Sequence, residues 1–303
     1  MNVFYPKILS KLLPYILLGL CLVLFLPSCD VINPEEDIPS YLYISDFNLT
    51  TSSSQGSASI KASEAWVLLD GEFIGAFPVQ STIPILTTGT HEIEVRAGIR
   101  DNGISSSPEI YPFYTSYTVN VDLEANEIDT IVPTIAYRPD ARFLFVEGFE
   151  LSGHLFREVL IGDDNNRIQR TQDDIFEGGF SGFTTIDIDQ PEVLLASTSR
   201  FRYPEDPFPT IYLEMNYKAE GLLGVGIIGY SSAGASDGQL VFSAGFRPKV
   251  EWNKIYFNLS QIFADNNFFE YKIAFQAAIP QEEGTYIQEN VTIWLDNIKL
   301  IQF

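Results

Sequence analysis

From Tyr41 to its end, the chain alternates between apolar and polar residues with the period of β-strands. Short runs rich in Val, Ile, Phe and Tyr are separated by clusters of Gly, Pro, Asn, Asp and Ser, which is typical of strands joined by turns. No stretch of a dozen residues has a helical period, and the best candidate, 259–263, is one turn at most. The pattern therefore predicts an all-β protein.

The segment 65–78 predicts two strands joined at Asp70-Gly71, because an Asp-Gly pair adopts positive φ at low cost and suits a tight hairpin. A turn at Gly89 then opens a strand in which alternate residues share one face: His91, Ile93 and Val95. These segments resemble the PEGA domain, a small β-sandwich of bacterial surface proteins, through a DGE-x-x-G-x-x-P run and a following G-x-H-x-I-x-V strand. The resemblance implies a structural or spacer role for residues 40–137.

The insert 102–112 is rich in Ser and Pro and departs from the compact PEGA pattern. It predicts a long hairpin loop. A solvated loop and a binding loop both remain open for it, since long loops on rigid scaffolds sometimes carry binding.

Residues 138–303 predict a second, larger β-sandwich, with long strands at 210–218 and 251–259. They resemble the jelly-roll domains of carbohydrate-binding modules through four short segments: Gly148-Phe-Glu150, Ser181-Gly182, Trp252 with Lys254, and Leu295-Asp-Asn-Ile-Lys-Leu300. The fold class that we expect is therefore two β-sandwich domains, a small PEGA-like one followed by a jelly roll.

The first residues have the pattern of a secretory signal peptide: Lys7 and Lys11, then an apolar run over 15–26. That run is shorter than the roughly 20 residues of a membrane-spanning helix. Leu26-Pro-Ser-Cys29 resembles a lipobox, which implies a signal peptide over 1–28 and lipidation, including palmitate, at Cys29. The acidic tether at 29–39 resembles the surface-export signal of Bacteroidota lipoproteins. We expect an outer-membrane lipoprotein at the cell surface, with a periplasm-facing position as the alternative.

Charge and cysteine content exclude several classes of function. The chain has 18 basic and 40 acidic residues, and loss of Lys7 and Lys11 with the signal leaves a net charge of −24. Nucleic-acid binding needs a basic footprint, so no nucleic-acid partner is expected. Cys21 lies in the signal and Cys29 is the lipid site, so the mature body has no cysteine for disulfides and depends on its hydrophobic cores.

We expect no catalytic residues. The chain has two histidines, no nucleophile elbow and no phosphate-binding glycine loop. The glycine-rich run 221–229 has no helix after it and indicates a curved sheet instead. Adjacent carboxylates are expected on solvated loops in so acidic a chain: Asp163 and Asp164, Asp173 and Asp174, and Asp187 and Asp189.

The resemblance to carbohydrate-binding modules implies a structural Ca²⁺ that ties the first strand to the last. The matching positions are Glu150 and Asp296, with Asp174 or Glu177 as further ligands, because Ca²⁺ takes six to eight oxygen ligands from carboxylates and carbonyls. The alternative is that Asp296 caps a turn and Glu150 is solvated.

Aromatic side chains are the candidates for glycan binding, because the C–H faces of sugars pack on flat rings. The candidates are Tyr203, Phe208, Tyr212, Tyr217, Tyr230 and Trp252. Most of the 41 aromatic residues must pack in the cores, so each candidate is also a core residue in the alternative interpretation. The proline-rich segment 201–209 differs, and it predicts a loop that presents Tyr203 and Phe208 to solvent. Asp129-Thr130-Ile131 resembles the short O-glycosylation acceptor of Bacteroidota.

The sequence therefore predicts a non-catalytic envelope lipoprotein with a glycan or polysaccharide as the ligand of the jelly roll. The alternative is a structural or accessory lipoprotein that docks onto an envelope protein. A concave aromatic groove with polar rims favours sugar, and a flat or convex aromatic patch favours a protein partner.

Overall fold

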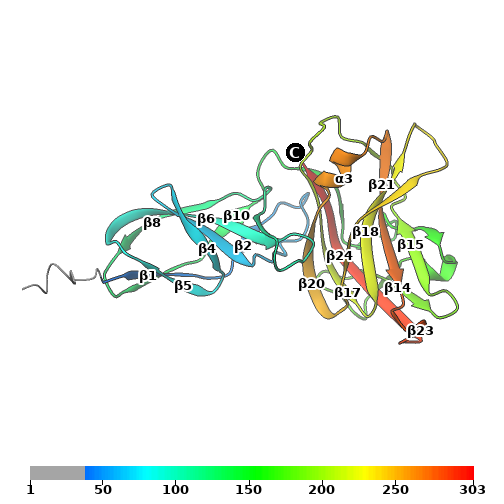
Figure 1. Cartoon of the computed structure of the whole chain (residues 1–303), viewed down its shortest axis with the longest axis horizontal. Helices are drawn as coiled ribbons and strands as arrows, with labels where there is room; N and C mark the ends of the chain where they lie inside the picture. Colours follow the sequence, from blue (N-terminus) through cyan, green and yellow to red (C-terminus); the bar gives the residue numbers. More distant parts are fainter. Residues whose placement is uncertain (1–37) are drawn as a thin grey trace, which may run out of the picture.

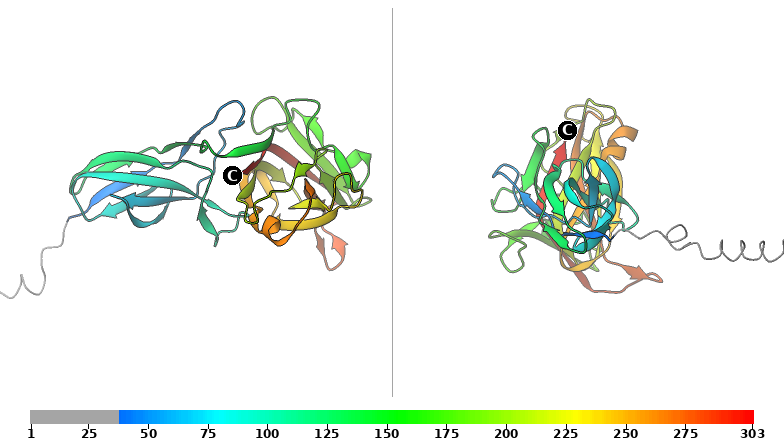
Figure 2. Two further views of the ribbon diagram at one scale, coloured as in Figure 1. Left: turned by 90° about the horizontal axis from the view of Figure 1, so that it is seen from above. Right: turned by 90° about the vertical axis from the view of Figure 1, so that its left-hand side faces the viewer.

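The computed structural model describes residues 38–303, which form two β-sandwiches arranged end to end (Figure 1). The signal peptide, Cys29 and most of the tether lie outside the described residues. The described chain enters at the far end of the first sandwich, whereas the C-terminus lies at the junction of the two (Figure 1). Two further views show the same elongated arrangement (Figure 2).

The first sandwich contains strands β1 to β10. One layer is the sheet β4-β3-β6-β7, with β8 also paired to β6, and the rest of the sandwich consists of β5-β1-β9 and β10-β2. The pairs β1–β9 and β2–β10 are parallel. The strands are β1 (Ser40–Ile44), β2 (Asn48–Thr50), β3 (Glu64–Leu69), β4 (Glu72–Pro78), β5 (Ser81–Ile85), β6 (Gly89–Arg100), β7 (Pro108–Ile110), β8 (Tyr117–Leu123), β9 (Ile128–Ile131) and β10 (Thr134–Ala136).

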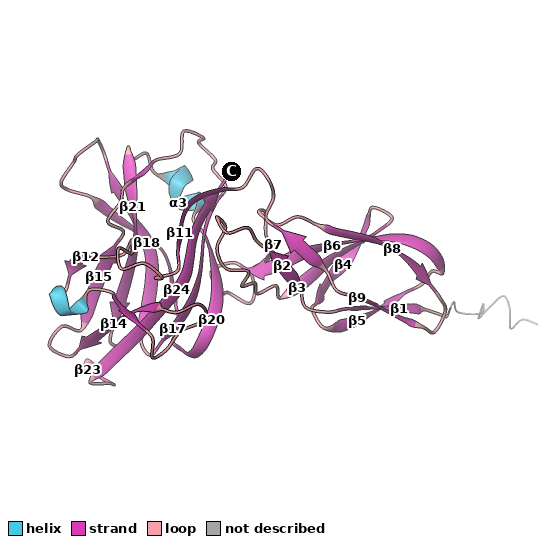
Figure 3. Cartoon of the chain, turned by 180° about the vertical axis from the view of Figure 1, so that it is seen from behind, coloured by secondary structure: helices cyan, strands magenta, loops and turns pink. Residues whose placement is uncertain are grey.

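The second sandwich consists mainly of two six-stranded sheets, which contain all the remaining strands except the hairpin β22–β23 (Figure 3). One is β13-β14-β24-β17-β20 with β11 on β24, and the other is β12-β15-β21-β18-β19 with β16 on β21. The strands of the first sheet are β11 (Arg142–Glu147), β13 (Gln169–Thr171), β14 (Ser181–Asp187), β17 (Ile211–Ala219), β20 (Lys249–Asn258) and β24 (Asn290–Gln302). Those of the second are β12 (Glu158–Ile161), β15 (Glu192–Ala196), β16 (Phe201–Arg202), β18 (Leu222–Tyr230), β19 (Gln239–Phe246) and β21 (Glu270–Ala278).

Short elements complete this sandwich: the hairpin β22 (Gln281–Glu282) and β23 (Thr285–Tyr286), the 3₁₀ turn η1 (Asp164–Asn166) and the helix α3 (Ser260–Asp265). The six-residue helix is slightly longer than the single turn that the sequence predicts. The all-β fold class is confirmed.

The strand pattern follows from the residues as expected. Asp70 and Gly71 have φ of 49° and 82°, so both adopt the left-handed region that the tight β3–β4 turn needs. Alternate residues of β6, such as Ile93 and Val95, are fully buried, while Glu92 is exposed. Each sandwich has its own apolar core, and the core of the first also contains three residues of the second at the junction: Tyr212, Tyr256 and Ile301.

Candidate functional site

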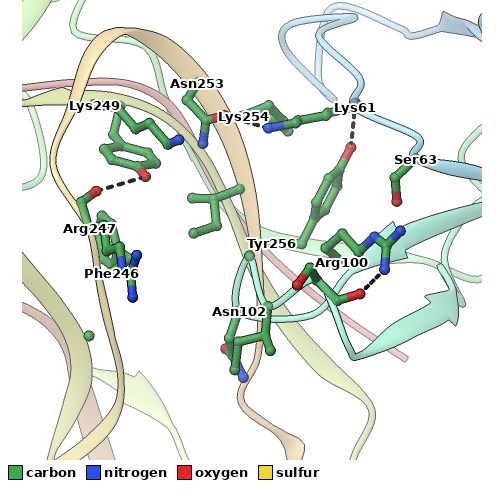
Figure 4. Close-up of a pocket in the computed structure, with 16 residues that line it drawn as sticks. Lys61, Ser63, Arg100, Asn102, Phe246, Arg247, Lys249, Asn253, Lys254 and Tyr256 are labelled. Atoms are coloured by element: carbon green, nitrogen blue, oxygen red, sulfur yellow. Dashed lines mark hydrogen bonds between the residues drawn. The ribbon is translucent and has the colours of Figure 1, made fainter.

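A groove with a volume of about 490 Å³ lies where the two sandwiches meet, and both supply its walls (Figure 4). The first sandwich contributes the segment before β3 and the end of β6 with the loop after it: Lys61, Ser63, Arg100 and 102–105. The second contributes β17, the β19–β20 turn and β20: Tyr217, 245–247, Lys249 and 253–256. The groove therefore depends on the packing of one sandwich against the other.

The loop between β6 and β7 forms one wall and is bound to the second sandwich through one backbone group and one side chain. The N–H of Asn102 donates to the carbonyl of Tyr256 over 2.9 Å, and the N–H of Asn258 donates to the Asp101 carboxylate over 3.0 Å. Asn102 and Gly103 have φ of 53° and 68°, a region that Asn and Gly adopt at low cost. This loop starts the insert 102–112, so the beginning of the insert is docked on the second sandwich and the rest continues into β7.

The groove is basic although the chain is acidic. The described residues include 16 of the 18 basic residues, all but Lys7 and Lys11, and 36 of the 40 acidic ones. Five of those basic residues line the groove, and no acidic residue lines it: Lys61, Arg100, Arg247, Lys249 and Lys254.

Two of the five cations are neutralised by ion pairs behind the groove wall. Arg100 pairs with Glu64, and Lys254 pairs with Glu214 over 2.7 Å. Lys61, Arg247 and Lys249 have no ion pair among residues 38–303. Burial, and then the charge of Lys249, lowers the pKa of Lys61. Sequence reasoning missed these three residues. The one signal was the Arg247-Pro-Lys249 segment, which is basic in an otherwise acidic chain, and Lys61 had no such signal.

A buried charge cluster lies beneath the groove and joins the two sandwiches. Glu214 on β17 is fully buried, and its carboxylate accepts hydrogen bonds from Lys254 and from two tyrosines of the first sandwich, Tyr111 over 2.7 Å and Tyr137 over 2.9 Å. Burial raises the pKa of Glu214, but Lys254 and Lys299 outweigh it, so the pKa is lowered overall. These buried hydrogen bonds therefore hold the two sandwiches together and fix the positions of the groove walls.

The structure separates the predicted aromatic residues. Tyr203 is 8% exposed and its hydroxyl donates to the carbonyls of Phe263 and Asn266, so the prediction that its loop presents it to solvent is wrong. Phe208 of the same segment is 81% exposed. Tyr212 is buried at the junction, and its hydroxyl donates to Glu109.

The other aromatic candidates also lie apart. Tyr230 is buried, with the Arg200 guanidinium 3.5 Å from its ring centroid. Trp252 is half-buried and its indole N–H donates to Asp174 over 2.8 Å. Tyr217 reaches the groove wall, and burial raises its pKa to about 12. The candidates therefore form no common aromatic surface.

The predicted calcium ligands hold one loop, the segment between β13 and β14. The Glu150 carboxylate accepts the N–H groups of Gly179 over 2.9 Å and Phe180 over 3.3 Å, and Asp296 accepts that of Glu177 over 3.4 Å. Asp174 instead binds Lys218 and Trp252.

Asp296 fits a cation best of these residues. It is 1% exposed, and burial, together with the nearby charge of Glu177, raises its pKa to about 7. No group of three or more His, Cys, Asp or Glu side chains in the described part of the chain is placed to hold a metal. A Ca²⁺ ion would therefore need Asp296, Glu177 and backbone carbonyls as ligands, and it would neutralise a buried carboxylate.

The two histidines lie apart, His91 next to a hairpin turn and His154 in a buried position. His91 Nδ1 lies 2.6 Å from Asp70, and its Nε2 lies 3.1 Å from Thr87 Oγ1 and 3.2 Å from the Thr88 carbonyl. Carboxylates and carbonyls only accept, so Nδ1 donates to Asp70, and the protonated ring can also donate from Nε2 to the Thr88 carbonyl. This Asp–His–Thr arrangement ties the β3–β4 turn to the turn before β6. His154 is buried, and burial lowers its pKa.

Thr130 lies on β9 and is exposed, so its predicted glycosylation stays a prediction. In the described part of the chain, no helix has both the length and the apolar character needed to cross a membrane.

Comparisons with known proteins find similar folds and no family. No protein-family model matches the chain, and no curated protein matches it significantly. Among solved structures, carbohydrate-binding modules described as belonging to the β-sandwich superfamily are 14% identical, with a TM-score of 0.37, over 88% of this chain and 99% of that chain.

A xylan-binding domain from Paenibacillus barcinonensis is 11% identical with a TM-score of 0.37, over 54% of this chain and 95% of its own. A family 30 carbohydrate-binding module of a Clostridium thermocellum cellulase is 14% identical with a TM-score of 0.36, over 53% and 96%. At these identities and scores the likeness defines neither a ligand nor a site for this chain.

Proposed function

We propose that this protein is a non-catalytic envelope lipoprotein, anchored through Cys29, that binds a saccharide in the groove between its two sandwiches. The lipobox-like Leu26-Pro-Ser-Cys29 and the acidic residues after it support an anchor in the outer membrane and a position at the cell surface. The first sandwich then acts as a spacer, because the described chain enters at its far end (Figure 1) and the groove lies where it meets the second sandwich.

The groove itself is the observation that carries the proposal. Its volume of about 490 Å³ lies within the range of roughly 300–1,000 Å³ that is usual for small-ligand clefts. Convergent polar side chains from both sandwiches line it, among them Ser63, Asn102 and Asn253, and such groups can exchange hydrogen bonds with sugar hydroxyls. The site differs from the aromatic face that the sequence predicts, since its polar groups outnumber its aromatic rings.

The lining also supports a binding role and not catalysis. Most glycoside hydrolases use two carboxyl groups on either side of the scissile bond. None of the 16 residues that line the groove is Asp, Glu, His or Cys, so the groove has neither the carboxyl pair of those hydrolases nor a thiol nucleophile.

A glycan array on the purified protein tests this function, with a substitution that fills the groove. Ser105→Trp places a large side chain in the lining, and Ser106→Trp is the matched control because Ser106 is exposed on the same loop and does not line the groove. We expect array binding that falls about tenfold or more in the first variant and is kept in the second, since about 1.4 kcal/mol of lost contact is one factor of ten.

Two results would contradict the proposal. Array binding that survives Ser105→Trp would move the site elsewhere, with exposed Phe208 as the first alternative. A blank array with a folded protein would favour the envelope-protein partner.

A further inference from the structure

The charge of the groove is opposite to that of the remaining molecule. The described residues have more than two acidic residues for each basic one, yet the groove is lined by basic residues and by no acidic one. The segregation of charge therefore indicates what kind of ligand the groove accepts.

Three cations in the groove are free to pair with a ligand. Lys61 belongs to the first sandwich, whereas Arg247 lies on the β19–β20 turn of the second and Lys249 begins β20. All three are exposed and have no ion pair within residues 38–303. Figure 4 shows the Lys61 and Lys249 side chains extending toward Asn253 from opposite sides, and Lys61 donates a hydrogen bond to its amide oxygen.

The neighbouring cations repel one another in the free protein. The charge of Lys249 lowers the pKa of Lys61, in addition to the effect of burial. An anion placed between them removes this repulsion and gains two attractions. Arginine adds a planar donor fork that matches carboxylate and sulfate oxygens.

The acidic exterior limits the size of the anion. Charges farther than about 8 Å are largely screened at physiological salt, so a ligand inside the groove interacts mainly with the groove cations. A nucleic-acid duplex or an anionic bilayer extends well beyond the groove and meets the acidic surface, which opposes its binding. The groove therefore fits a short, flexible segment with its own spaced charges and with hydroxyls for the neutral polar groups.

We propose that the groove binds an anionic saccharide, one that carries carboxylate or sulfate groups, with Lys61, Arg247 and Lys249 pairing with those groups. Ser63 and Asn253 then exchange hydrogen bonds with the ring hydroxyls. This inference rests on the proposed saccharide-binding function and adds the chemical class of the ligand.

Calorimetric titration with hexasaccharides tests the class. The ligands are a hexagalacturonate, a sulfated galactan hexamer and, as a neutral ligand, cellohexaose, with a glutamate hexapeptide as a non-sugar anion. The variant is Arg247→Gln/Lys249→Gln, and its matched control is Arg157→Gln/Arg167→Gln, which removes two exposed charges far from the groove lining.

We expect at least one anionic hexasaccharide to bind, with an affinity that falls about tenfold or more in the groove variant and stays unchanged in the control, because hydrogen bonds to charged groups are among the strong ones. The carboxylated and sulfated ligands show which anion is preferred. Binding should also weaken as salt rises.

The other outcomes separate the two proposals. Cellohexaose that binds as tightly as the acidic sugars, and equally to the groove variant, overturns the anionic class and leaves saccharide binding intact. A glutamate hexapeptide that binds as tightly as the acidic sugars overturns the saccharide and favours a protein partner. No binding by any hexasaccharide, with the protein folded, contradicts the proposed function itself.

Discussion

His91 shows at the scale of a single residue how a sequence motif becomes a structural contact. The spacing of Asp70, Gly71, Gly89 and His91 predicts a hairpin followed by a strand, and the structure places the imidazole between Asp70 and the turn before its own strand. The hydrogen bond to Asp70, followed by that to Thr88, raises the pKa of His91. The contact therefore favours the protonated ring.

We predict that His91 titrates above the ordinary histidine value of 6.5. Because the folded pKa is raised, the contact stabilises the hairpin fully below that ordinary value, and the contribution is lost as the pH rises through the folded pKa. Proton NMR of the two histidines measures both values. Asp70→Asn should bring the pKa of His91 back toward 6.5 and leave that of His154 unchanged. A pKa below 6.5 for His91 in the wild type would contradict a stabilising hydrogen bond between His91 and Asp70.

Tyr203 shows where residue-scale prediction fails. Prolines around it indicate an exposed loop, and neighbouring Phe208 is indeed exposed. The Tyr203 ring nevertheless packs 5.0 Å from that of Phe263 on α3, about sixty positions away in the sequence. Local sequence indicates that a segment is a loop, but long-range packing decides which of its side chains turn inward.

At the scale of elements, strands and tight turns were predictable and pairings were not. Period-2 alternation and an Asp-Gly pair act locally, so they define β3, β4 and β6 from sequence. The parallel pairs β1–β9 and β2–β10 join segments far apart in the chain, and no local pattern specifies them. The groove wall was missed for the same reason, because the start of the loop is positioned by long-range hydrogen bonds, from Asn102 to Tyr256 and from Asn258 to Asp101.

The loop between β13 and β14 carries the calcium prediction. Its backbone is held by Glu150 and by Asp296, whose pKa is raised from 3.8 to about 7 by burial. A carboxyl with a raised folded pKa contributes stability that is fully present below 3.8 and is lost as the pH rises through about 7. Ca²⁺ should restore the lost stability, because its positive charge neutralises the ionised Asp296 carboxylate.

We therefore expect the chelated protein to lose stability between pH 4 and pH 7, and Ca²⁺ at pH 7.5 to raise its melting temperature by about 5 °C or more. Asp101, whose pKa is raised to about 6, also lowers the stability as the pH rises, so it adds to the effect of Asp296. Asp296→Asn should remove the calcium response and part of the pH response, whereas Asp173→Asn, on the exposed surface, should keep both. If neither chelator nor Ca²⁺ changes the melting temperature at pH 7.5, the carboxylates hold the loop without a metal.

For the whole molecule, the contact between the sandwiches depends on buried charge. Glu214 binds Lys254, Tyr111 and Tyr137, and the Lys299 ammonium donates to Tyr137 over 3.1 Å. Burial lowers the pKa of Lys299 to about 8, and Glu214 opposes that shift. The position of both groove walls therefore depends on the Glu214 carboxylate. Nothing in the sequence distinguishes Glu214 from the other acidic residues of the strands.

Removing that carboxylate leaves two lysines buried without a counter-charge. We predict that Glu214→Gln lowers the free energy of unfolding by about 3–5 kcal/mol at pH 7, the range for breaking a buried ion pair. Glu251→Gln, which removes an exposed charge from β20, should change it by about 0.5 kcal/mol or less. Denaturant unfolding, followed by tryptophan fluorescence in both sandwiches, measures each difference.

The pH dependence of the Glu214→Gln deficit separates a charge effect from simple loss of packing. A lysine with a lowered folded pKa costs stability while it is protonated, and the cost disappears as the pH rises from about 8 to 10.5. In Glu214→Gln, the protonated Lys299 has lost its counter-charge, so it lowers the free energy of unfolding by more at pH 7 than it does in the wild type. In the wild type, deprotonation of Lys299 at high pH also takes a counter-charge away from Glu214. The deficit should therefore shrink as the pH rises from 7 to 10, and a deficit that stays constant over that range would assign the role of Glu214 to packing.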